Sequence, residues 1–340
     1  MNVREMTVNW NRGQALRLAA VAALILAPVL VWPAFVFDGL WFSVAGLVTV
    51  SPLVVPGILL TAWIMSSGAD RIIKQAFEGR VAYTVLAASL IGALTPVCGV
   101  TVLPLMVGLL AAGVPLAPVM AFWLSSPVTD PAMLATTAAT LGFAFAIGKT
   151  VAAFGLGIFG GTVTALLTSS QTQQSVLRTG GLAADLTAKS CCGATSFEPR
   201  VWQQADRRQA FVRQASATTR LILICLLPAF FAEYALNAAL TPGALAHYVG
   251  EDKWWAIPAA VFVGAPAYID GYAALPLTRA LVDNGMAPGA AMAFLVSGGV
   301  VSIWGALAIF PVLKLKPFLL YLALAVTGSV LAGYVFGWVY

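Results

Sequence analysis

Long apolar stretches, separated by short polar segments, dominate the hydrophobic pattern of this chain. Five of them have the length of about 20 residues with which a helix crosses a bilayer. They cover residues 15–37, 40–67, 146–168, 219–240 and 317–339. The pattern therefore predicts an all-α polytopic membrane protein.

Two further apolar stretches, residues 81–112 and 254–284, are too long for one straight membrane helix. At 1.5 Å per residue each would exceed about 45 Å, against a hydrocarbon core of about 30 Å. Breaks are available at Thr95-Pro96-Val97-Cys98-Gly99 and at Gly264-Ala265-Pro266, because proline removes a backbone donor and glycine loosens the turn. We therefore expect a broken helix in each stretch.

The stretches that follow, residues 116–145 and 288–311, contain a second pair of helix-breaking sequences. These are Ser125-Ser126-Pro127 and Ser297-Gly298-Gly299, which occupy equivalent positions. Both are predicted to interrupt their helices.

A segment of 37 residues occurs twice. Residues 92–128 align without a gap onto residues 264–300 at an offset of 172, and 13 of the 37 positions are identical. This composition gives about one identity in twelve by chance. Because both copies are apolar and both are punctuated by glycine and proline, they are typical of the discontinuous helices that transporters fold around a midplane substrate site. Transport is therefore the leading functional interpretation.

Basic residues near span ends mark the cytoplasmic side of a membrane protein. They place the N-terminus, residues 71–80 and the polar connector 169–216 inside, and the connector includes a possible surface helix over residues 202–213. An even number of crossings must separate residues 71–80 from the connector, so one of the three apolar stretches between them, the Ser-Ser-Pro stretch, is predicted to be re-entrant. From Glu251 and Asp252 outside to Lys314 and Lys316 inside, two stretches must make one net crossing, so one of them is again re-entrant. The two copies then cross in opposite directions.

This topology is an inverted repeat with the first helix as an unpaired extra. It has seven full spans, two re-entrant hairpins and a C-terminus outside, and a count of eight to ten full spans is the alternative; the expectation is thus about 7–10 membrane segments. The chain divides into an N-terminal membrane half with the first copy (1–168), a cytoplasmic connector (169–216) and a C-terminal membrane half with the second copy (217–340).

Composition agrees with a membrane location. Apolar residues make up 60% of the chain and charged residues 9%, and the mean hydropathy is +0.91, which leaves too little polar surface for a soluble globule. The net charge of +5 reflects the orientation of the spans and indicates no nucleic-acid partner. Four cysteines do not form a disulfide framework. The expected partners are the lipid bilayer and a small-molecule substrate; no cofactor or resident metal is predicted, and the oligomeric state stays open.

Chemistry is expected at the breaks, where unwound backbone can hold a substrate. Cys98 lies at the first break, and its thiol is a soft ligand for metals or trivalent metalloids, with a small buried hydrophobe as the alternative. Its equivalent in the second copy is Asp270; intramembrane acids are usually functional, although this one could be a satisfied structural carboxylate. The predicted substrate-binding residues are Cys98, Pro96, Gly99, Asp270, Gly271, Ser125 and Ser297.

Three acids in apolar stretches, Asp130, Glu233 and Asp270, are candidates for proton coupling. Asp130 and Glu233 could equally cap a helix end. Arg279 and Asp283 are four residues apart, which predicts an ion pair on one helix face.

Cys191 and Cys192 form a vicinal pair in the connector. Neighbouring thiols can share a soft ion, and the basic sequence around them favours the thiolate. Adjacent cysteines also occur by chance, and no CxxC sequence or histidine cluster completes a four-ligand zinc site. Both interpretations stay open.

The sequence TPVCGVTVLPLMVGLLAAGVPLAPVMAFWLSSPVTDPAM resembles the signature of the ArsP-type permeases, a bacterial predicted-permease family that includes efflux proteins for trivalent organoarsenicals. GAPAYIDGYAALPLTRALVDNGMAPGAAMAFLVSGG and KLKPFLLY resemble the C-terminal half of that family, so the likeness covers most of residues 81–340. Members commonly show Cys-Ser-Cys after Thr-Pro, whereas this chain reads Cys98-Gly99-Val100. A thiol relay of Cys98 with Cys191 and Cys192 could replace the missing thiol.

The resemblance implies a multi-pass permease of the bacterial inner membrane that exports trivalent organoarsenicals. An ion gradient would drive export, because no nucleotide loop of the GxxxxGK type is present. A second possibility keeps the transporter and changes the cargo to a soft metal, a sulfur compound or an organic anion. A membrane enzyme or assembly factor is least favoured, since the chain has one histidine, no HExxH sequence and no Ser/His/Asp set.

Overall fold

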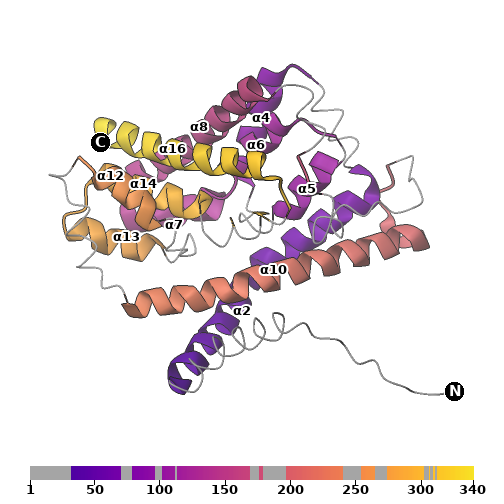
Figure 1. Ribbon diagram of the computed structural model, residues 1–340, viewed down its shortest axis with the longest axis horizontal. Coiled ribbons are helices and arrows are strands. Elements are labelled where there is room, and N and C mark those ends of the chain that lie inside the picture. The colour runs from indigo at the N-terminus through magenta and orange to yellow at the C-terminus, as the bar shows by residue number, and fades with distance from the viewer. Residues whose placement is uncertain are drawn as a thin grey trace, which may run out of the picture.

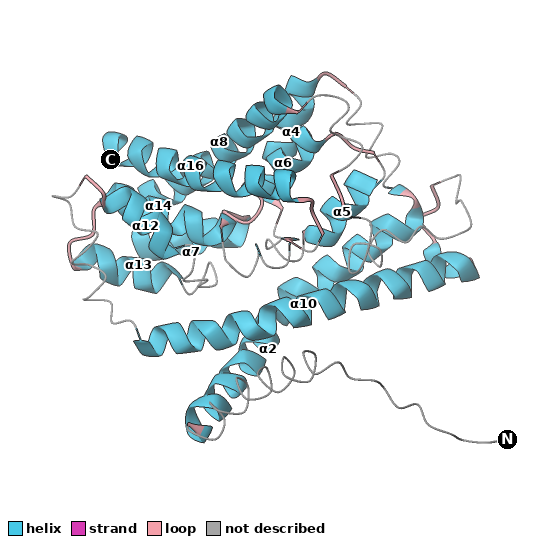
Figure 2. Ribbon diagram, in the orientation of Figure 1, coloured by secondary structure: helices cyan, strands magenta, loops and turns pink. Residues whose placement is uncertain are grey.

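The computed structural model describes residues 32–69, 79–95, 102–111, 113–168, 176–178, 197–239, 254–264, 274–301, 306, 309, 310 and 312–340. Within these residues the chain forms helices and no strand, as Figures 1 and 2 show. The helices in chain order are α2 (Pro33–Ser67), α4 (Val81–Leu94), α5 (Leu103–Ala111), α6 (Leu116–Ser125), α7 (Pro131–Leu141), α8 (Phe143–Leu167), the short 3-10 helix η2 (Val201–Gln203), α10 (Ala205–Ala239), α12 (Ala256–Gly264), α13 (Ala274–Asp283), α14 (Pro288–Val300) and α16 (Leu315–Val339). The predicted all-α fold is confirmed.

The internal repeat extends far beyond the 37 residues whose sequences align. Residue 205, where α10 begins, follows the start of α2 by 172 positions, and the ends of these two 35-residue helices are also 172 positions apart. The same offset separates both ends of the 25-residue helices α8 and α16. Helices α2 and α8 of the first copy therefore recur as α10 and α16 in the second.

The same helix-to-helix turn is built twice inside this repeat. Gly113 and Gly285 both adopt left-handed backbone angles, with φ of 90° and 94°, which glycine adopts without steric cost. The N–H of Gly113 donates to the Leu110 carbonyl at 3.1 Å, and that of Gly285 donates to the Val282 carbonyl at 3.0 Å. The repeat is thus present in the backbone conformation as well as in the amino-acid sequence.

Equivalent helices run in opposite directions. A Cβ built on Gly39, near the start of α2, would lie 2.6 Å from Phe231 near the end of α10. At the other end, the Arg207 guanidinium donates to the Ser67 carbonyl at 2.9 Å. These two helices pack on each other, and in Figure 1 they cross in the lower part of the picture, with the upper end of α2 near α5. The two copies are therefore related by an approximate twofold axis, which confirms the predicted inverted arrangement.

Residues at equivalent positions meet on this axis. Between α2 and α10 a small apolar cluster draws on both copies, with Val54 and Ile58 from α2 and Ile222, Leu226 and Phe230 from α10, and Val50 packs against it. Helices α8 and α16 also cross on the axis, since a Cβ on Gly328 would lie 1.9 Å from Cδ1 of its equivalent, Leu156. The axis is thus lined by direct contacts between the two copies.

Four described helices are long and apolar enough to cross a membrane, namely residues 33–52 of α2, α8, residues 205–232 of α10, and α16. Many of their large apolar side chains are exposed, including Trp338 at 90% and Leu166 at 85%. Such surfaces suit a lipid environment. The chain is therefore a multi-pass membrane protein.

The predicted helix breaks fall between shorter helices. In the first copy α4 ends at Leu94 and α5 begins at Leu103; in the second, α12 ends at Gly264 and α13 begins at Ala274. The 14 residues of α4 span about 21 Å, less than the hydrocarbon core of about 30 Å. The first long stretch is broken as expected, because Thr95 after α4 has extended backbone angles, while the break expected after Gly264 lies outside the described residues.

The interruption predicted at Ser297-Gly298-Gly299 is wrong. Helix α14 continues through these residues to Val300, and the Val301 N–H still donates to the Ser297 carbonyl at 2.7 Å. In the first copy α6 does end at Ser125, followed by a turn over residues 126–128. The difference lies in Pro127, which has no N–H for the helix, whereas its equivalent Gly299 keeps one.

Two other sequence-based boundaries differ from the structure. Helix α10 begins at Ala205 and continues without a break to Ala239, so the expected surface helix at 202–213 is the start of one long helix together with the residues just before it. Helix α2 runs through residues 37–40, where two spans were expected to meet. The expected first span is otherwise outside the described residues.

Candidate functional site

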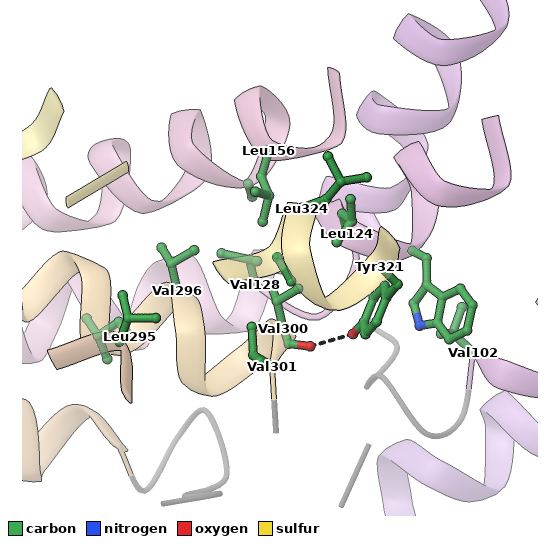
Figure 3. Packing of buried hydrophobic residues seen from close by; sticks show 14 of the residues in the cluster. Val102, Leu124, Val128, Leu156, Leu295, Val296, Val300, Val301, Tyr321 and Leu324 are labelled. Atoms are coloured by element: carbon green, nitrogen blue, oxygen red, sulfur yellow. Dashed lines mark hydrogen bonds between the residues drawn. The ribbon is translucent and has the colours of Figure 1, made fainter. Parts of the chain in front are cut away.

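The ends of α6 and α14 meet at the centre of the molecule. A Cβ on Gly299 in α14 would lie 2.7 Å from the carbonyl oxygen of Pro127, its equivalent after α6. Tyr321 of α16 lies beside this contact and donates its hydroxyl hydrogen to the Val300 carbonyl, as the dashed line in Figure 3 shows. The inverted repeat thus brings two helix C-terminal ends together on its axis.

Ser125 and Ser297, both predicted to bind substrate, occupy matching packing positions. Ser125 donates to the Phe122 carbonyl at 3.1 Å and would meet a Cβ on Gly92 at 2.1 Å. Ser297 donates to the Phe294 carbonyl at 3.1 Å and would meet a Cβ on Gly264 at 2.5 Å. Both serines are fully buried. The structure therefore gives them a role in packing α4 on α6 and α12 on α14, while substrate binding by them stays a prediction.

The predicted soft-ligand site lies outside the described residues. This holds for Pro96, Cys98, Gly99, Asp270, Gly271, Cys191 and Cys192. The chain that follows each break is packed in the core, since Val102 and Leu103 are buried in the first copy and Ala274 and Leu275 in the second. Whether Cys98 approaches Asp270 or the connector thiols stays a prediction.

The proposed proton carriers have different positions. One Asp130 carboxylate oxygen accepts hydrogen bonds from the N–H groups of Ala132 at 2.8 Å and Met133 at 2.9 Å, at the start of α7. This confirms the capping alternative for Asp130. Glu233 lies in α10, but its side chain is outside the described part.

Arg279 and Asp283 form the predicted ion pair at 3.0 Å on an exposed helix face.

A buried lysine is a candidate functional residue that sequence reasoning missed. Lys149 of α8 is 2% exposed, and in the described part only Arg207 is also charged and buried. Its equivalent in α16 is Tyr321, whose neutral hydroxyl satisfies a backbone carbonyl. A single cation within an apolar span was visible in the sequence and could have been singled out, because intramembrane charges are rare and usually functional.

Two buried donors at the end of α6 were also missed. Trp123 is fully buried and Ser126 is 2% exposed, and neither Trp123 Nε1 nor Ser126 Oγ has a hydrogen-bond partner among the described residues. The indole ring packs on Tyr321 with 5.0 Å between the ring centroids. Sequence alone could not show that these side chains face a dry interior.

The connector contacts the second copy beside α16. The Arg178 N–H donates to the Val312 carbonyl and the Lys314 N–H donates to the Val176 carbonyl, each at 2.9 Å. The Arg178 guanidinium also lies 4.5 Å from the centre of the Phe310 ring. The segment after α8 and the start of α16 are therefore on the same side of the molecule.

No group of three or more His, Cys, Asp or Glu side chains able to hold a metal ion gathers in the part of the chain that the structure describes. The buried polar groups there are hydroxyls, the Trp123 indole N–H, the Gln214 amide and the cations of Lys149 and Arg207.

Comparisons with known proteins identify a permease family. The model of the ArsP_1 family, described as "Predicted permease", matches residues 40–338. The UPF0718 protein MJ0584 of Methanocaldococcus jannaschii is 25% identical to this chain, and the match covers 82% of this chain and 90% of that protein. No solved structure gives a significant match.

Proposed function

Since the chain belongs to the ArsP-type predicted permease family, we propose that this membrane transporter is a permease of the bacterial inner membrane that exports small thiophilic solutes, above all trivalent organoarsenicals. An ion gradient drives this export. The family assignment supports a transporter rather than an enzyme. The cargo, direction and coupling rest on the chemistry of the residues at the helix breaks.

The observation that carries the proposal is the inverted repeat itself. Equivalent residues touch on its axis at Leu156 with Gly328 and at Pro127 with Gly299. In transporters built from inverted repeats, one repeat rocks against the other around a site near the membrane midplane. The two copies here contact each other along one axis, the arrangement on which such a movement depends.

The proposed cargo site uses the first break of each copy. Cys98 supplies the soft ligand and Asp270, its equivalent, supplies a carboxylate, while Pro96, Gly99 and Gly271 are the residue types that favour unwound backbone at such a site. Thiolate binds trivalent arsenic well because both are soft. Cys191 and Cys192 would pass the solute to this site from the cytoplasmic connector.

Coupling to an ion gradient follows from the absence of a nucleotide loop in the sequence. Asp270 and Glu233 are the proposed proton carriers, since an acid within a membrane segment can change charge during transport. Asp130 is the weaker candidate, because its carboxylate caps α7.

A second cargo class, organic anions, is favoured by Lys149. Its ammonium group is buried in α8, whereas the equivalent position in α16 uses the neutral Tyr321. The fold can therefore fill this position without a charge. A buried cation then serves an anionic solute better than it serves packing.

The proposal is tested by arsenic accumulation in cells that lack their own arsenical exporters. Expression should lower the accumulation of methylarsenite and leave that of inorganic arsenate unchanged. Cys98→Ser should abolish the effect with little loss of folded protein, and Asp270→Asn should weaken export more than expression. Unchanged methylarsenite accumulation in a strain with abundant protein would exclude this cargo.

A further inference from the structure

The end of α6 holds two of the three buried side-chain polar atoms that have no hydrogen-bond partner within the described residues. They are Nε1 of Trp123 and Oγ of Ser126, here called the α6 donor pair. The two residues are three positions apart at a helix end, so their side chains start about one turn apart. A buried donor without a partner is unfavourable, because it has lost its hydrogen bond to water.

The α6 donor pair has no hydrogen-bond partner among the described residues. Ser125 donates to the Phe122 carbonyl, and the Tyr321 hydroxyl donates to the Val300 carbonyl, but neither hydroxyl oxygen accepts from the pair. The indole N–H can only donate, so Trp123 requires an acceptor. A molecule that the protein binds can supply it.

The second copy shows that the fold does not need these donors. The residues equivalent to Trp123 and Ser126 are Leu295 and Gly298 in α14, which carry no polar side-chain atom. That helix is as deeply buried as α6, and it packs on α16 as α6 packs on α8. The donor pair is therefore an addition to one copy only, at a structural cost.

We infer that the α6 donor pair binds an acceptor oxygen of the transported solute when α6 and α16 move apart during the transport cycle. The inference rests on the proposed function and specifies its cargo as a thiophilic solute that carries oxygen on or beside the soft atom. An arsenical with two As–OH groups that meets one thiol loses one water and forms one As–S bond. The second As–OH remains, and its oxygen can accept from Trp123 and Ser126.

The test compares two aromatic thiophilic probes, phenylarsine oxide, which is hydrated to As–OH groups, and phenylmercury, which carries no such oxygen. Binding is measured on the purified full chain for wild type, Trp123→Phe and Ser126→Ala. Phenylalanine keeps the ring that packs on Tyr321, and alanine fits the helical backbone of Ser126. Trp338→Phe is the matched control, since Trp338 is 90% exposed at the end of α16.

Each α6 variant should raise the dissociation constant of phenylarsine oxide about three- to tenfold, the worth of one hydrogen bond, and leave that of phenylmercury unchanged. The thermal midpoint of Ser126→Ala should stay equal or rise, because the change removes an unsatisfied buried donor, whereas that of Trp123→Phe also falls with the lost buried volume. Trp338→Phe should match wild type for both probes.

Unchanged phenylarsine oxide binding by both α6 variants would overturn the inference and leave the proposed function intact. Equal weakening of both probes would also overturn it, because the residues would then be structural. Wild-type protein that binds neither probe would overturn the proposed function and this inference with it.

Discussion

Pro127 and Gly299 occupy equivalent positions in the two copies, and the Pro127 carbonyl oxygen lies 2.7 Å from where a Cβ on Gly299 would stand. Only glycine permits this approach. It joins the end of α6 to the end of α14 on the axis of the inverted repeat.

Gly299→Ala should therefore force the two helix ends apart. We expect a loss of about 1–3 kcal/mol of stability, as for other overpacked sites, seen as a lower midpoint of thermal unfolding in detergent. Gly298→Ala is the matched control in the same helix turn, because its Cβ would have an ordinary contact at 3.6 Å. Equal thermal midpoints for the two variants would show that the close contact between Gly299 and Pro127 does not cause the loss of stability.

The two serine–glycine contacts make a symmetric prediction. Gly92→Ala and Gly264→Ala should each destabilise the protein by about 1–3 kcal/mol, because the new methyl group would meet a serine oxygen and a backbone carbonyl. Gly155→Ala in α8 has open space around it and should stabilise by about 0.5–1 kcal/mol through helix propensity. A lower stability for only one of the two variants, Gly92→Ala or Gly264→Ala, would argue against equivalent packing of the two copies.

Lys149 is predicted to serve transport rather than packing. Lys149→Met should yield folded protein with reduced export, and Lys149→Arg should retain more export because it keeps the charge. Solute efflux and the yield of folded protein are measured together on the same preparations. Export by Lys149→Met at the wild-type rate would remove Lys149 from the transport pathway.

The two ends of α16 are predicted to lie on opposite sides of the membrane. Lys314, just before α16, bonds to the connector segment at Val176, and the 25 residues of the helix extend about 37 Å beyond it. Tags within residues 179–196 should therefore be cytoplasmic and tags after Tyr340 periplasmic. Labelling with membrane-impermeant reagents decides this, and a shared side for both tags would contradict the inverted topology.

Much of the fold could be predicted from sequence because proline and glycine mark helix breaks directly. The repeat at an offset of 172 residues could be seen in the sequence where function or close packing requires the same residue in both copies, as at Gly92 and Ser125 with their equivalents. The offset could not be seen between α2 and α10, because exposed apolar positions tolerate many side chains. Pro56 and Pro228 are one of the few identical pairs in these two helices.

The candidate site could be predicted only in part. Break residues and soft ligands have sequence signatures, whereas the burial of Trp123, Ser126 and Lys149 depends on which helix faces the interior. The apolar stretches here are hydrophobic on most sides, so periodicity does not reveal the buried face. The same limit hid the continuity of α14 through Ser297, since a glycine pair can either end a helix or permit close packing.

The most direct test of the account is uptake of phenylarsine oxide into energised everted membrane vesicles, where export from the cell appears as accumulation. Wild-type vesicles and those with Cys225→Ser, a thiol of α10 away from the breaks, should accumulate the arsenical and release it when the ion gradient is collapsed. Vesicles with Cys98→Ser should not accumulate it. Wild-type vesicles that behave like vesicles without the protein would contradict the central claim that this permease exports thiophilic solutes.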